Sequence, residues 1–337
     1  MSTRPSDDPI AATGGAQGEE GRSHMDLLSA FKVPEAAIPV IDRILSPEDA
    51  LLIEALPSAT FGGQDARSAL EVSTGETWPD TRLDPLLRGA YRRGVLDLED
   101  ETFTRFRLGD FYTMLEVFVD TEPEAYLALP RETQVALDRW CFESYCEGLG
   151  DDVRPTSDRV AGLDETLGFI DTIDRPIWLN RCDCRTLAGS CDKPVDTCIS
   201  FRNGINTLSH RGILKPITKE QAKAVVRGAN DAGLMQTISD NAICNCCSDC
   251  CYLFRAQAAR ASGAAWPLAE SIAAVGPDLC IGCGVCVSRC PFGALALEDG
   301  EAVRNAGLCR GCGLCAETCP TSAIAMLPRD DTRRPVK

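Results

Sequence analysis

The order of apolar and polar positions in the first third of the chain predicts three helices followed by two strands. Ser46 as N-cap and Pro47 at the first position predict a helix over residues 47–56, and a second helical run follows near residues 65–71. Apolar residues recur at helical spacing over residues 83–94. Apolar and polar residues then alternate at 96–98 and again at 106–108. Because a short acidic turn separates these two runs, they are predicted to pair as a β-hairpin.

Three helices followed by a hairpin is the pattern of a winged helix, so residues 25–130 are predicted to form a winged-helix-like domain. A DNA-binding surface must be basic, because neutralisation of phosphates supplies most of the affinity. Residues 25–130 instead carry 9 basic and 20 acidic side chains, and the Glu-Asp-Glu turn at 99–101 forms the tip of the hairpin. We therefore expect this domain to dock another protein rather than DNA.

Composition divides the rest of the chain. Residues 1–24 are rich in glycine, serine and acidic residues and are predicted to be a disordered tail. Residues 131–180 are predicted to be a helical connector, and residues 181–262 a helical, cysteine-rich metal-binding domain. Residues 263–328 hold a further cysteine-rich domain, and residues 329–337 form a short charged tail.

Two absences in the sequence bear on where the protein works. No uninterrupted apolar stretch approaches the roughly 20 residues that a membrane-spanning helix needs. The N-terminal residues also lack the apolar region of a secretion signal. We therefore expect a cytoplasmic protein without membrane insertion.

The number of cysteines predicts a metalloprotein rather than an ordinary globular protein. The 337 residues include 19 cysteines, and such a dense set without an export signal indicates metal or redox chemistry rather than a disulfide framework. Only two histidines are present. Any metal site must therefore be built almost wholly from thiolates, which suits iron–sulfur clusters or zinc.

Two cysteine runs near the C-terminus share the spacing C-x2-C-x2-C-x3-C-P and lie 29 residues apart. Two residues between thiols let one short loop wrap a cubane cluster, and the intervening glycines permit tight turns. An apolar stretch after each run, at 294–297 and 323–326, is predicted to form a short strand. Zinc ribbons, the alternative, pair C-x2-C motifs across a longer loop. The spacing thus predicts two 4Fe–4S clusters, with the candidate ligands Cys280, Cys283, Cys286, Cys290, Cys309, Cys312, Cys315 and Cys319.

With these two runs, residues 276–328 resemble the bacterial-type two-cluster ferredoxins. The resemblance implies that the fourth cysteine of each run ligates the cluster of the other run. One cluster would then take Cys280, Cys283, Cys286 and Cys319. The other would take Cys309, Cys312, Cys315 and Cys290.

Nine further cysteines lie in residues 181–262, the only sizeable block with a net positive charge, which has 11 basic and 7 acidic side chains. Side chains of adjacent residues diverge, so the C-x-C and C-C pairs favour several centres, or one centre with additional reactive thiols. Iron–sulfur clusters and zinc both stay open for this block. The candidate ligands are Cys182, Cys184, Cys191, Cys198, Cys244, Cys246, Cys247, Cys250 and Cys251.

The CxCR…CNCC pattern of this block resembles poorly characterised iron–sulfur proteins of anaerobes, in which it precedes a dicluster ferredoxin, and this implies a metal site. His210 is the only histidine within the block, but a histidine before a glycine turn is more often a surface or capping residue. Cys141 and Cys146 are expected to be buried structural thiols. Four arginines beside the cysteines are candidates to offset a cluster's negative charge or to bind an anionic substrate. They are Arg181, Arg185, Arg202 and Arg211.

These predictions combine into an α+β protein with a winged-helix-like N-terminal domain, a helical cysteine-rich middle domain and a dicluster ferredoxin C-terminal domain. The predicted function is iron–sulfur electron transfer, as an oxidoreductase or a subunit of one, between the two clusters and the middle cysteines. Two alternatives stay open: a redox- or oxygen-sensing winged-helix regulator, and a simple ferredoxin-type carrier with a structural zinc site. No G-x-G-x-x-G after a strand and no P-loop is recognisable, so we expect electrons to come from a redox partner protein. The sequence indicates neither catalytic residues, nor a substrate, nor an oligomeric state.

Overall fold

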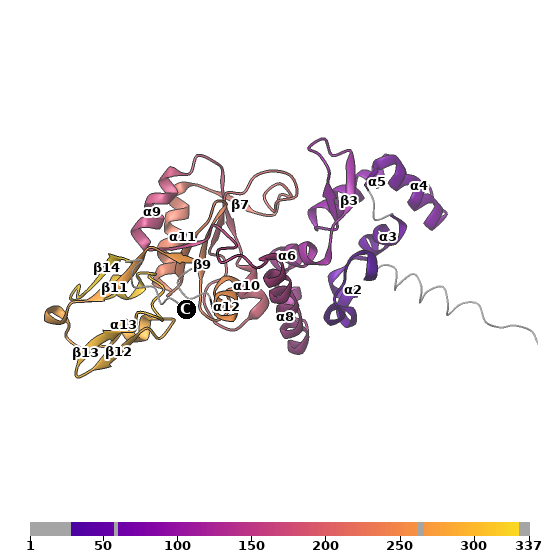
Figure 1. Ribbon diagram of the computed structural model, residues 1–337. Helices are drawn as coiled ribbons and strands as arrows, with labels where there is room; N and C mark the ends of the chain where they lie inside the picture. The colour runs from indigo at the N-terminus through magenta and orange to yellow at the C-terminus, as the bar shows by residue number, and fades with distance from the viewer. Residues whose placement is uncertain (1–27, 57–59, 262–265, 330–337) are drawn as a thin grey trace, which may run out of the picture. The chain divides into compact units, whose positions relative to one another are not determined.

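The computed structural model of the protein describes residues 28–56, 60–261 and 266–329 (Figure 1). The chain divides after Phe111 into two compact units. The tail predicted over residues 1–24 lies outside the described residues, as does all but the first residue of the predicted C-terminal tail. No helix in the described parts of the chain combines the length and the apolar character needed to cross a bilayer.

The first unit consists of short helices and a three-stranded antiparallel sheet. The strands lie in the order β1-β3-β2 and are β1 (Phe61–Gly62), β2 (Leu96–Leu98) and β3 (Arg105–Leu108). The helices are η1 (Glu35–Val40), α2 (Ile41–Ile44), α3 (Pro47–Ala55), α4 (Gly63–Thr74) and α5 (Asp80–Arg92). The three helices and the hairpin predicted from the sequence are confirmed as α3, α4, α5 and β2–β3.

Side-chain hydrogen bonds at the start of α3 explain where this helix begins and how it is attached to α5. The hydroxyl of Ser46 caps α3 by accepting a hydrogen bond of 3.1 Å from the backbone N–H of Asp49. The carboxylate of Asp49 is buried and accepts two hydrogen bonds from Arg93, at 2.6 and 2.7 Å. Because Arg93 follows α5 directly, this bidentate ion pair ties the end of α5 to the start of α3.

The second unit is built on a seven-stranded sheet in the order β10-β4-β8-β9-β6-β5-β7. All neighbouring pairs are antiparallel except β10 and β4. The strands are β4 (Arg159–Ala161), β5 (Ile177–Asn180), β6 (Cys198–Ser200), β7 (Lys215–Ile217), β8 (Met235–Ile238), β9 (Ala242–Cys246) and β10 (Leu268–Ala269). The helices are α6 (Phe111–Thr121), α7 (Pro123–Leu127), α8 (Arg131–Gly148), α9 (Leu163–Thr172), α10 (Asp183–Ala188), α11 (Lys219–Asp231) and α12 (Tyr252–Ala259).

Two apolar clusters lie on the two faces of this sheet. Side chains alternate along a strand, so neighbouring residues of β4 belong to different clusters. Ala161 packs in the cluster with Ile170 of α9 and Val226 of α11. Val160 packs in the cluster with Phe254 of α12. Figure 1 shows α9 and α11 side by side, and these two helices are in contact. The sheet is therefore covered by α9 and α11 on one face and by α12 on the other.

The sheet is the part of the fold that the sequence does not predict. Residues 131–180, predicted to be a helical connector, contain α8 but also β4 and β5. Residues 181–262, predicted to be helical, contain four strands, β6 to β9, and the helical prediction is wrong for these segments. Each strand has only three to five residues, and alternation over so few positions does not stand out from an irregular segment.

The C-terminal part of the second unit carries two antiparallel ribbons. They pair β11 (Ser271–Val275) with β14 (Ile324–Pro328), and β12 (Leu295–Glu298) with β13 (Glu301–Arg304). Its helices are η2 (Pro277–Leu279), α13 (Val285–Arg289) and α14 (Leu314–Glu317). The short strands predicted after each cysteine run are confirmed as β12 and β14. Arg329 closes this part by donating to the carbonyl oxygens of Ala269 and Cys309, at 3.1 and 2.8 Å.

Candidate iron–sulfur and thiolate sites

The two cysteine runs fold into similar loops that turn on glycines. Gly282 and Gly311 occupy equivalent positions and both have a left-handed backbone, with φ of +65° and +70°. A Cβ atom at Gly282 would collide with the carbonyl oxygen of Gly300, and one at Gly311 with that of Ser271. Glycine is therefore required at both positions, so that one loop can approach the turn between β12 and β13, and the other the strand β11, closely enough to enclose a cavity.

Each cavity is lined by three cysteines of one run and by the fourth cysteine of the other. All nineteen cysteines of the chain are free thiols in the structure. The first cavity contains Cys280, Cys283, Cys286 and Cys319. The second cavity contains Cys290, Cys309, Cys312 and Cys315. The fold thus brings together the two sets of four thiols that the ferredoxin resemblance implies.

Backbone amides around the cavities are arranged as an iron–sulfur cluster requires. The N–H groups of Ala294 and Ala323 donate to the sulfurs of Cys290 and Cys319, each at 3.2 Å, and that of Ala302 donates to Cys280 at 3.4 Å. Amide hydrogen bonds of this kind stabilise thiolate sulfur and adjust the potential of a bound cluster. The donor set, the glycine turns and these amides therefore fit a 4Fe–4S cluster in each cavity.

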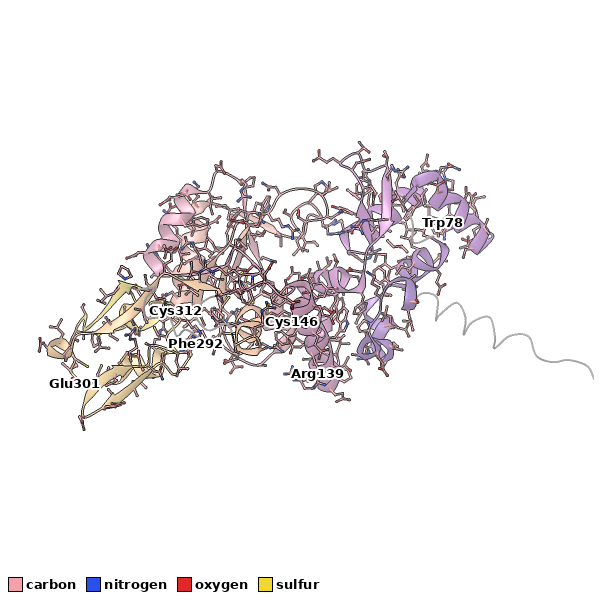
Figure 2. All side chains as sticks on the ribbon, in the orientation of Figure 1. Trp78, Arg139, Cys146, Phe292, Glu301 and Cys312 are labelled. Carbon is pink, nitrogen blue, oxygen red and sulfur yellow. The ribbon has the colours of Figure 1, made fainter. Side chains whose placement is uncertain are left out.

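The second cavity faces the seven-stranded sheet. Cys312 and the fully buried Leu314 belong to the apolar cluster that also contains Cys246 and Cys251. Phe292 packs against this cluster, with its ring centroid 5.3 Å from that of Phe254, and Figure 2 shows Phe292 close to Cys312. The ferredoxin-like part and the cysteine-rich sheet are thus joined by a continuous dry core.

Side-chain hydrogen bonds reinforce this junction. The Nε of Arg310 donates to the Oε1 of Gln257 on α12 at 2.9 Å, and Gln257 in turn donates to the carbonyl oxygen of Trp266 at 3.0 Å. Arg289 of α13 donates to the carbonyl oxygens of Asn230 and Asp231 at the end of α11, the second of these at 2.9 Å. These contacts fix the second cavity against the sheet.

The first cavity contributes no residue to this core, and part of its lining is exposed to solvent. Cys283 is exposed, in contrast to the buried Cys312 of the second cavity. Two apolar side chains beside it are also unusually exposed, Ile281 at 66% and Leu279 at 56%. Exposed apolar residues around a redox centre are typical of a surface that a partner protein covers.

The nine cysteines of the middle block fall into two separate groups. Six form a row, which we call the thiol row: Cys182, Cys184, Cys198, Cys244, Cys246 and Cys251. Successive members of the row interact through their thiols, from Cys182 through Cys198, Cys244 and Cys246 to Cys251, and Cys184 lies near Cys182 and Cys251. The sulfurs of Cys246 and Cys251 are 3.3 Å apart. The other three, Cys191, Cys247 and Cys250, form what we call the thiol triad.

The geometry of β9 explains this division. Cys244 and Cys246 are two residues apart in the strand and so point to the same face of the sheet. Cys247 follows the last residue of β9 and joins another buried cluster, together with Cys250. Each adjacent pair, 246–247 and 250–251, therefore contributes one thiol to the row and one to the triad. Adjacent side chains diverge, as the sequence pattern indicates.

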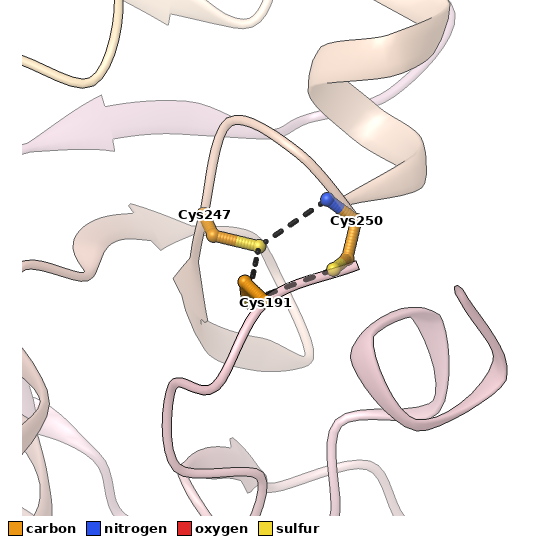
Figure 3. Close-up of side chains that lie close together, drawn as sticks. All are labelled: Cys191, Cys247 and Cys250. Atoms are coloured by element: carbon orange, nitrogen blue, oxygen red, sulfur yellow. Dashed lines mark hydrogen bonds between the residues drawn. The ribbon is translucent and has the colours of Figure 1, made fainter. Parts of the chain in front are cut away.

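The thiol triad is compact (Figure 3). The Sγ of Cys191 lies 3.9 Å from that of Cys247 and 3.7 Å from that of Cys250. The backbone N–H of Cys250 donates to the sulfur of Cys247 at 3.3 Å. Cys247 and Cys250 are buried, whereas Cys191 is half-buried. The triad therefore meets solvent on the side of Cys191.

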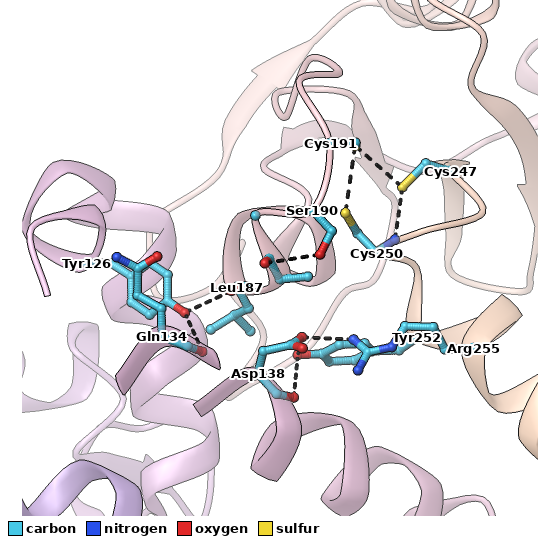
Figure 4. Close-up of polar contacts among 12 residues, drawn as sticks. Tyr126, Gln134, Asp138, Leu187, Ser190, Cys191, Cys247, Cys250, Tyr252 and Arg255 are labelled. Carbon is cyan, nitrogen blue, oxygen red and sulfur yellow. Dashed lines mark hydrogen bonds and ion pairs between the residues drawn. The ribbon is translucent and has the colours of Figure 1, made fainter. Parts of the chain in front are cut away.

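Polar contacts hold the two helices next to the triad (Figure 4). The hydroxyl of Tyr126 donates to the carbonyl oxygen of Leu187 in α10 at 3.0 Å, just before the loop that carries Cys191. On the other side, Tyr252 and Arg255 of α12 donate to Oδ1 of Asp138 at 3.1 and 2.9 Å. Since α12 begins directly after Cys251, both segments that supply the triad are anchored to α7 and α8.

Neighbouring groups lower the pKa of Cys244 and Cys251 in the row and of Cys247 in the triad. Hydrogen bonds from Cys198 and Cys246 lower the pKa of Cys244 in the row, although burial opposes them. A hydrogen bond from Cys250 and the positive charge of Arg185 lower the pKa of Cys247 in the triad. Because the thiolate is the form that binds metal, both groups are disposed to act as ligands.

The remaining candidate residues from the sequence line neither cavity and belong to neither the thiol row nor the thiol triad. Cys141 is buried and burial raises its pKa, as it does for the half-buried Cys146, and neither thiol is a member of the row or the triad. His210 is exposed, and its backbone N–H donates to the hydroxyl of Thr207. Of the four arginines, Arg185 and Arg211 are buried, while Arg181 pairs with Asp196. Arg202 is exposed.

A buried pair of carboxyl groups beside the row gives no signal in the sequence. Asp120 of α6 and Asp183 of α10 interact through their side chains, and their buried oxygens lack another donor. Burial raises the pKa of Asp120 to about 6 and raises that of Asp183 well above its usual range. The two groups therefore share a proton at neutral pH, since two adjacent buried carboxylates repel each other.

The raised pKa of this pair predicts how stability depends on pH. Because the pKa of these carboxyl groups is higher in the folded protein, the folded state binds the proton more tightly than the unfolded state. The protein therefore loses stability as pH rises from about 4, the pKa of an unfolded aspartate, through the pKa of the pair in the folded protein. Replacing Asp120→Asn should therefore flatten the fall in unfolding midpoint between pH 5 and pH 8, and should stabilise the protein at pH 8. Anaerobic urea unfolding of both proteins at the two pH values measures this effect, and parallel curves would show that the pair does not hold a proton.

Comparison with known proteins identifies one part of the chain. No curated protein matches this chain. Residues 272–320 match the family model described as a 4Fe–4S dicluster domain, and they include both loops and all eight cysteines that line the two cavities. The match indicates iron–sulfur electron transfer. The C-terminal part of this protein is therefore a dicluster domain of the ferredoxin type.

Proposed function

We propose that this protein is an iron–sulfur electron-transfer protein, an oxidoreductase or a subunit of one, that relays electrons between two ferredoxin-type 4Fe–4S clusters and a further centre held by the thiol row. Cys280, Cys283, Cys286 and Cys319 would hold one cluster, and Cys290, Cys309, Cys312 and Cys315 the other. Such clusters supply one-electron acceptance and release at low potential when bound.

The observation that carries the proposal is that Cys312 lies in the same apolar cluster as Cys246 and Cys251. A plain carrier has no need to bury one of its cluster sites against a second set of thiols. The contacts of Phe292 with Phe254 and of Arg310 with Gln257 hold the two sides of the junction in place. The chain thereby fixes the separation between the second cavity and the thiol row.

The exposed side of the dicluster domain supplies the other end of the relay. Ile281 and Leu279 surround the first cavity with apolar surface, and the nearby Asp278, Glu298 and Glu301 are exposed. An apolar centre with an acidic rim suits a redox partner protein that presents basic side chains. Electrons would enter or leave at the first cavity, whereas the second cavity faces inward.

The thiol row can be tested by metal analysis. The full chain, purified without oxygen, should contain more iron and sulfide than the about eight of each that two cubanes require. The change Cys246→Ser should remove the excess and leave those eight, because the ligands in the dicluster domain do not depend on Cys246. Cys146→Ser is the matched control, since its thiol is a member of neither group, and should change nothing. About eight iron in the unaltered protein would reduce the function to that of a simple ferredoxin-type carrier.

We further propose that the winged-helix-like domain predicted over residues 25–130 docks a protein; in the structure its helices and hairpin belong to the unit that ends at Phe111, and residues 112–130 belong to the second unit. Three arginines of its third helix region already have intramolecular partners: Arg82 pairs with Glu76 at 2.7 Å, Arg93 pairs with Asp49, and Arg88 lies over the ring of Phe103 at 4.5 Å. These contacts engage the three side chains within the domain and offset part of their positive charge.

The full chain should accordingly show no retention of a DNA duplex library in gel-shift assays at about 0.15 M salt, where surface charges are screened beyond about 8 Å. Its binding to a basic partner should weaken as salt increases. Sequence-specific DNA binding under these conditions would instead support the redox-sensing regulator.

A further inference from the structure

The thiol triad is spaced differently from the thiols of the dicluster domain. Its three sulfurs all lie within 4.8 Å of one another, and no other three ligand atoms of cysteine, histidine, aspartate or glutamate do so in the described parts of the chain. In a cubane each thiolate binds a different iron, so cluster ligands are spread apart. The eight cysteines of the two cavities, which serve as an internal comparison, are spread in this way.

The distances within the triad are those of thiolates that share a single ion. With zinc–sulfur bonds of about 2.3 Å, two ligands of a tetrahedral zinc site lie about 3.8 Å apart. The observed separations are 3.9 Å for Cys191 and Cys247, and 3.7 Å for Cys191 and Cys250 (Figure 3). Zn²⁺ combines this geometry with a preference for thiolate ligands.

The triad has three protein ligands where a closed zinc site has four. Among the described residues, no fourth thiolate, imidazole or carboxylate oxygen lies within 4.8 Å of all three sulfurs. The half-buried Cys191 leaves one side of the group accessible, while Cys247 and Cys250 close the other sides. A bound ion would therefore complete its coordination with a ligand that does not come from this set of side chains.

A buried arginine balances the charge of such a site. Three thiolates and one Zn²⁺ sum to −1, and a charge in an apolar environment must be offset. Arg185 is only 1% exposed and its guanidinium attracts the thiolate of Cys247. Hydrogen bonds from Arg185 to the carbonyl oxygens of Pro194 and Asn245, at 2.6 and 2.5 Å, fix its position. Three thiolates, Zn²⁺ and the guanidinium of Arg185 together carry no net charge, so a fourth ligand that is neutral leaves the site uncharged.

We propose that Cys191, Cys247 and Cys250 bind one zinc ion as a mononuclear site, separate from the thiol row, and that its fourth position takes a neutral oxygen ligand, water or the carbonyl oxygen of a substrate. Three protein ligands with one exchangeable position is the arrangement of zinc sites that act as Lewis acids. The triad would thus give the middle block a second chemistry beside electron transfer. This proposal does not depend on the relay, because it concerns different thiols.

Zinc X-ray absorption on the full chain tests the proposal, because it reports zinc alone in the presence of iron–sulfur clusters. Protein purified without oxygen, from cells supplied with both iron and zinc, should show three sulfurs at about 2.3 Å and one oxygen at about 2.0 to 2.1 Å around zinc. The change Cys191→Ser should lower zinc by about one per chain and leave acid-labile sulfide unchanged. Cys146→Ser, another half-buried thiol, should lower neither.

Three results would overturn the proposal. Four sulfurs around zinc would show a closed structural site. Loss of iron and sulfide together in Cys191→Ser would show that the triad ligates a cluster. Protein whose clusters are intact but which contains no zinc would show that the triad does not hold this ion. The first measurement needs no variant, so it decides the matter even if Cys191→Ser fails to fold.

Discussion

Replacing Cys290→Ser should remove the cluster of the second cavity and spare that of the first, although Cys290 belongs to the first cysteine run. The reason is that Cys290 lines the second cavity with Cys309, Cys312 and Cys315. Loss of one thiolate of four destabilises a cubane, so iron and sulfide should each fall by about four per chain. Iron and sulfide analysis on anaerobically purified protein measures the loss.

Double replacements reveal which cluster is lost. Cys290→Ser combined with Cys312→Ser should lose no more than the single change, because both thiols line the second cavity. Cys290→Ser combined with Cys283→Ser should lose about eight iron, since Cys283 lines the first cavity. The reverse pattern, in which Cys290 and Cys283 behave as one unit, would refute the crossed assignment.

The second large effect is expected at Gly311. A methyl group there would collide with the carbonyl oxygen of Ser271, and φ is +70°. Left-handed strain and overpacking together should cost about 2 to 5 kcal/mol. The change Gly311→Ala should therefore open the loop that carries Cys309 and Cys312 and release the cluster of the second cavity.

Gly293→Ala provides the matched control for this change. Gly293 also has a left-handed backbone, with φ of +60°, but a Cβ there would meet nothing within 4 Å. It should cost about 1 to 2 kcal/mol from backbone strain alone and retain both clusters. Iron content and the anaerobic unfolding midpoint separate the two variants, and equal losses would show that the close approach of Ser271 is not what requires glycine.

What the sequence predicts well are features encoded over short distances along the chain. The spacing of each C-x2-C-x2-C-x3-C-P run specifies its own loop, and the dicluster domain follows from two such runs. Helices such as α3 and α11 can be recognised from their N-terminal caps: Ser46 caps the first, and Thr218 caps the second by accepting from the backbone N–H of Gln221. These signals need no knowledge of the rest of the fold.

The division of the nine middle cysteines could not be predicted, because it depends on pairing between distant strands. Cys198 lies opposite Cys244 only because β6 pairs with β9. Cys191 reaches Cys247 and Cys250 across more than fifty residues of sequence. The pattern does indicate that adjacent thiols separate, but which thiols meet is decided by the sheet. The consequence for experiments is direct: changing Cys246 and Cys247 together would disturb both groups, whereas single changes address one at a time.

The carboxyl pair shows the same limit. Asp120 and Asp183 are ordinary acidic residues in the sequence, and Asp183 stands at the start of α10, where an acidic residue is common. Only the packing of α6 against the start of α10 brings the two carboxyl groups together. Burial, and not residue type, makes them a proton-holding site.

The central claim is that the second cavity and the thiol row hold centres that exchange electrons across one dry core. Electron paramagnetic resonance of the full chain, stepwise reduced without oxygen, tests this claim most directly. The account predicts a signal beyond those of two cubanes and magnetic coupling between that signal and one cubane, with both features absent in Cys246→Ser and present in Cys146→Ser. A spectrum accounted for by two cubanes alone, and unchanged by Cys246→Ser, would contradict it.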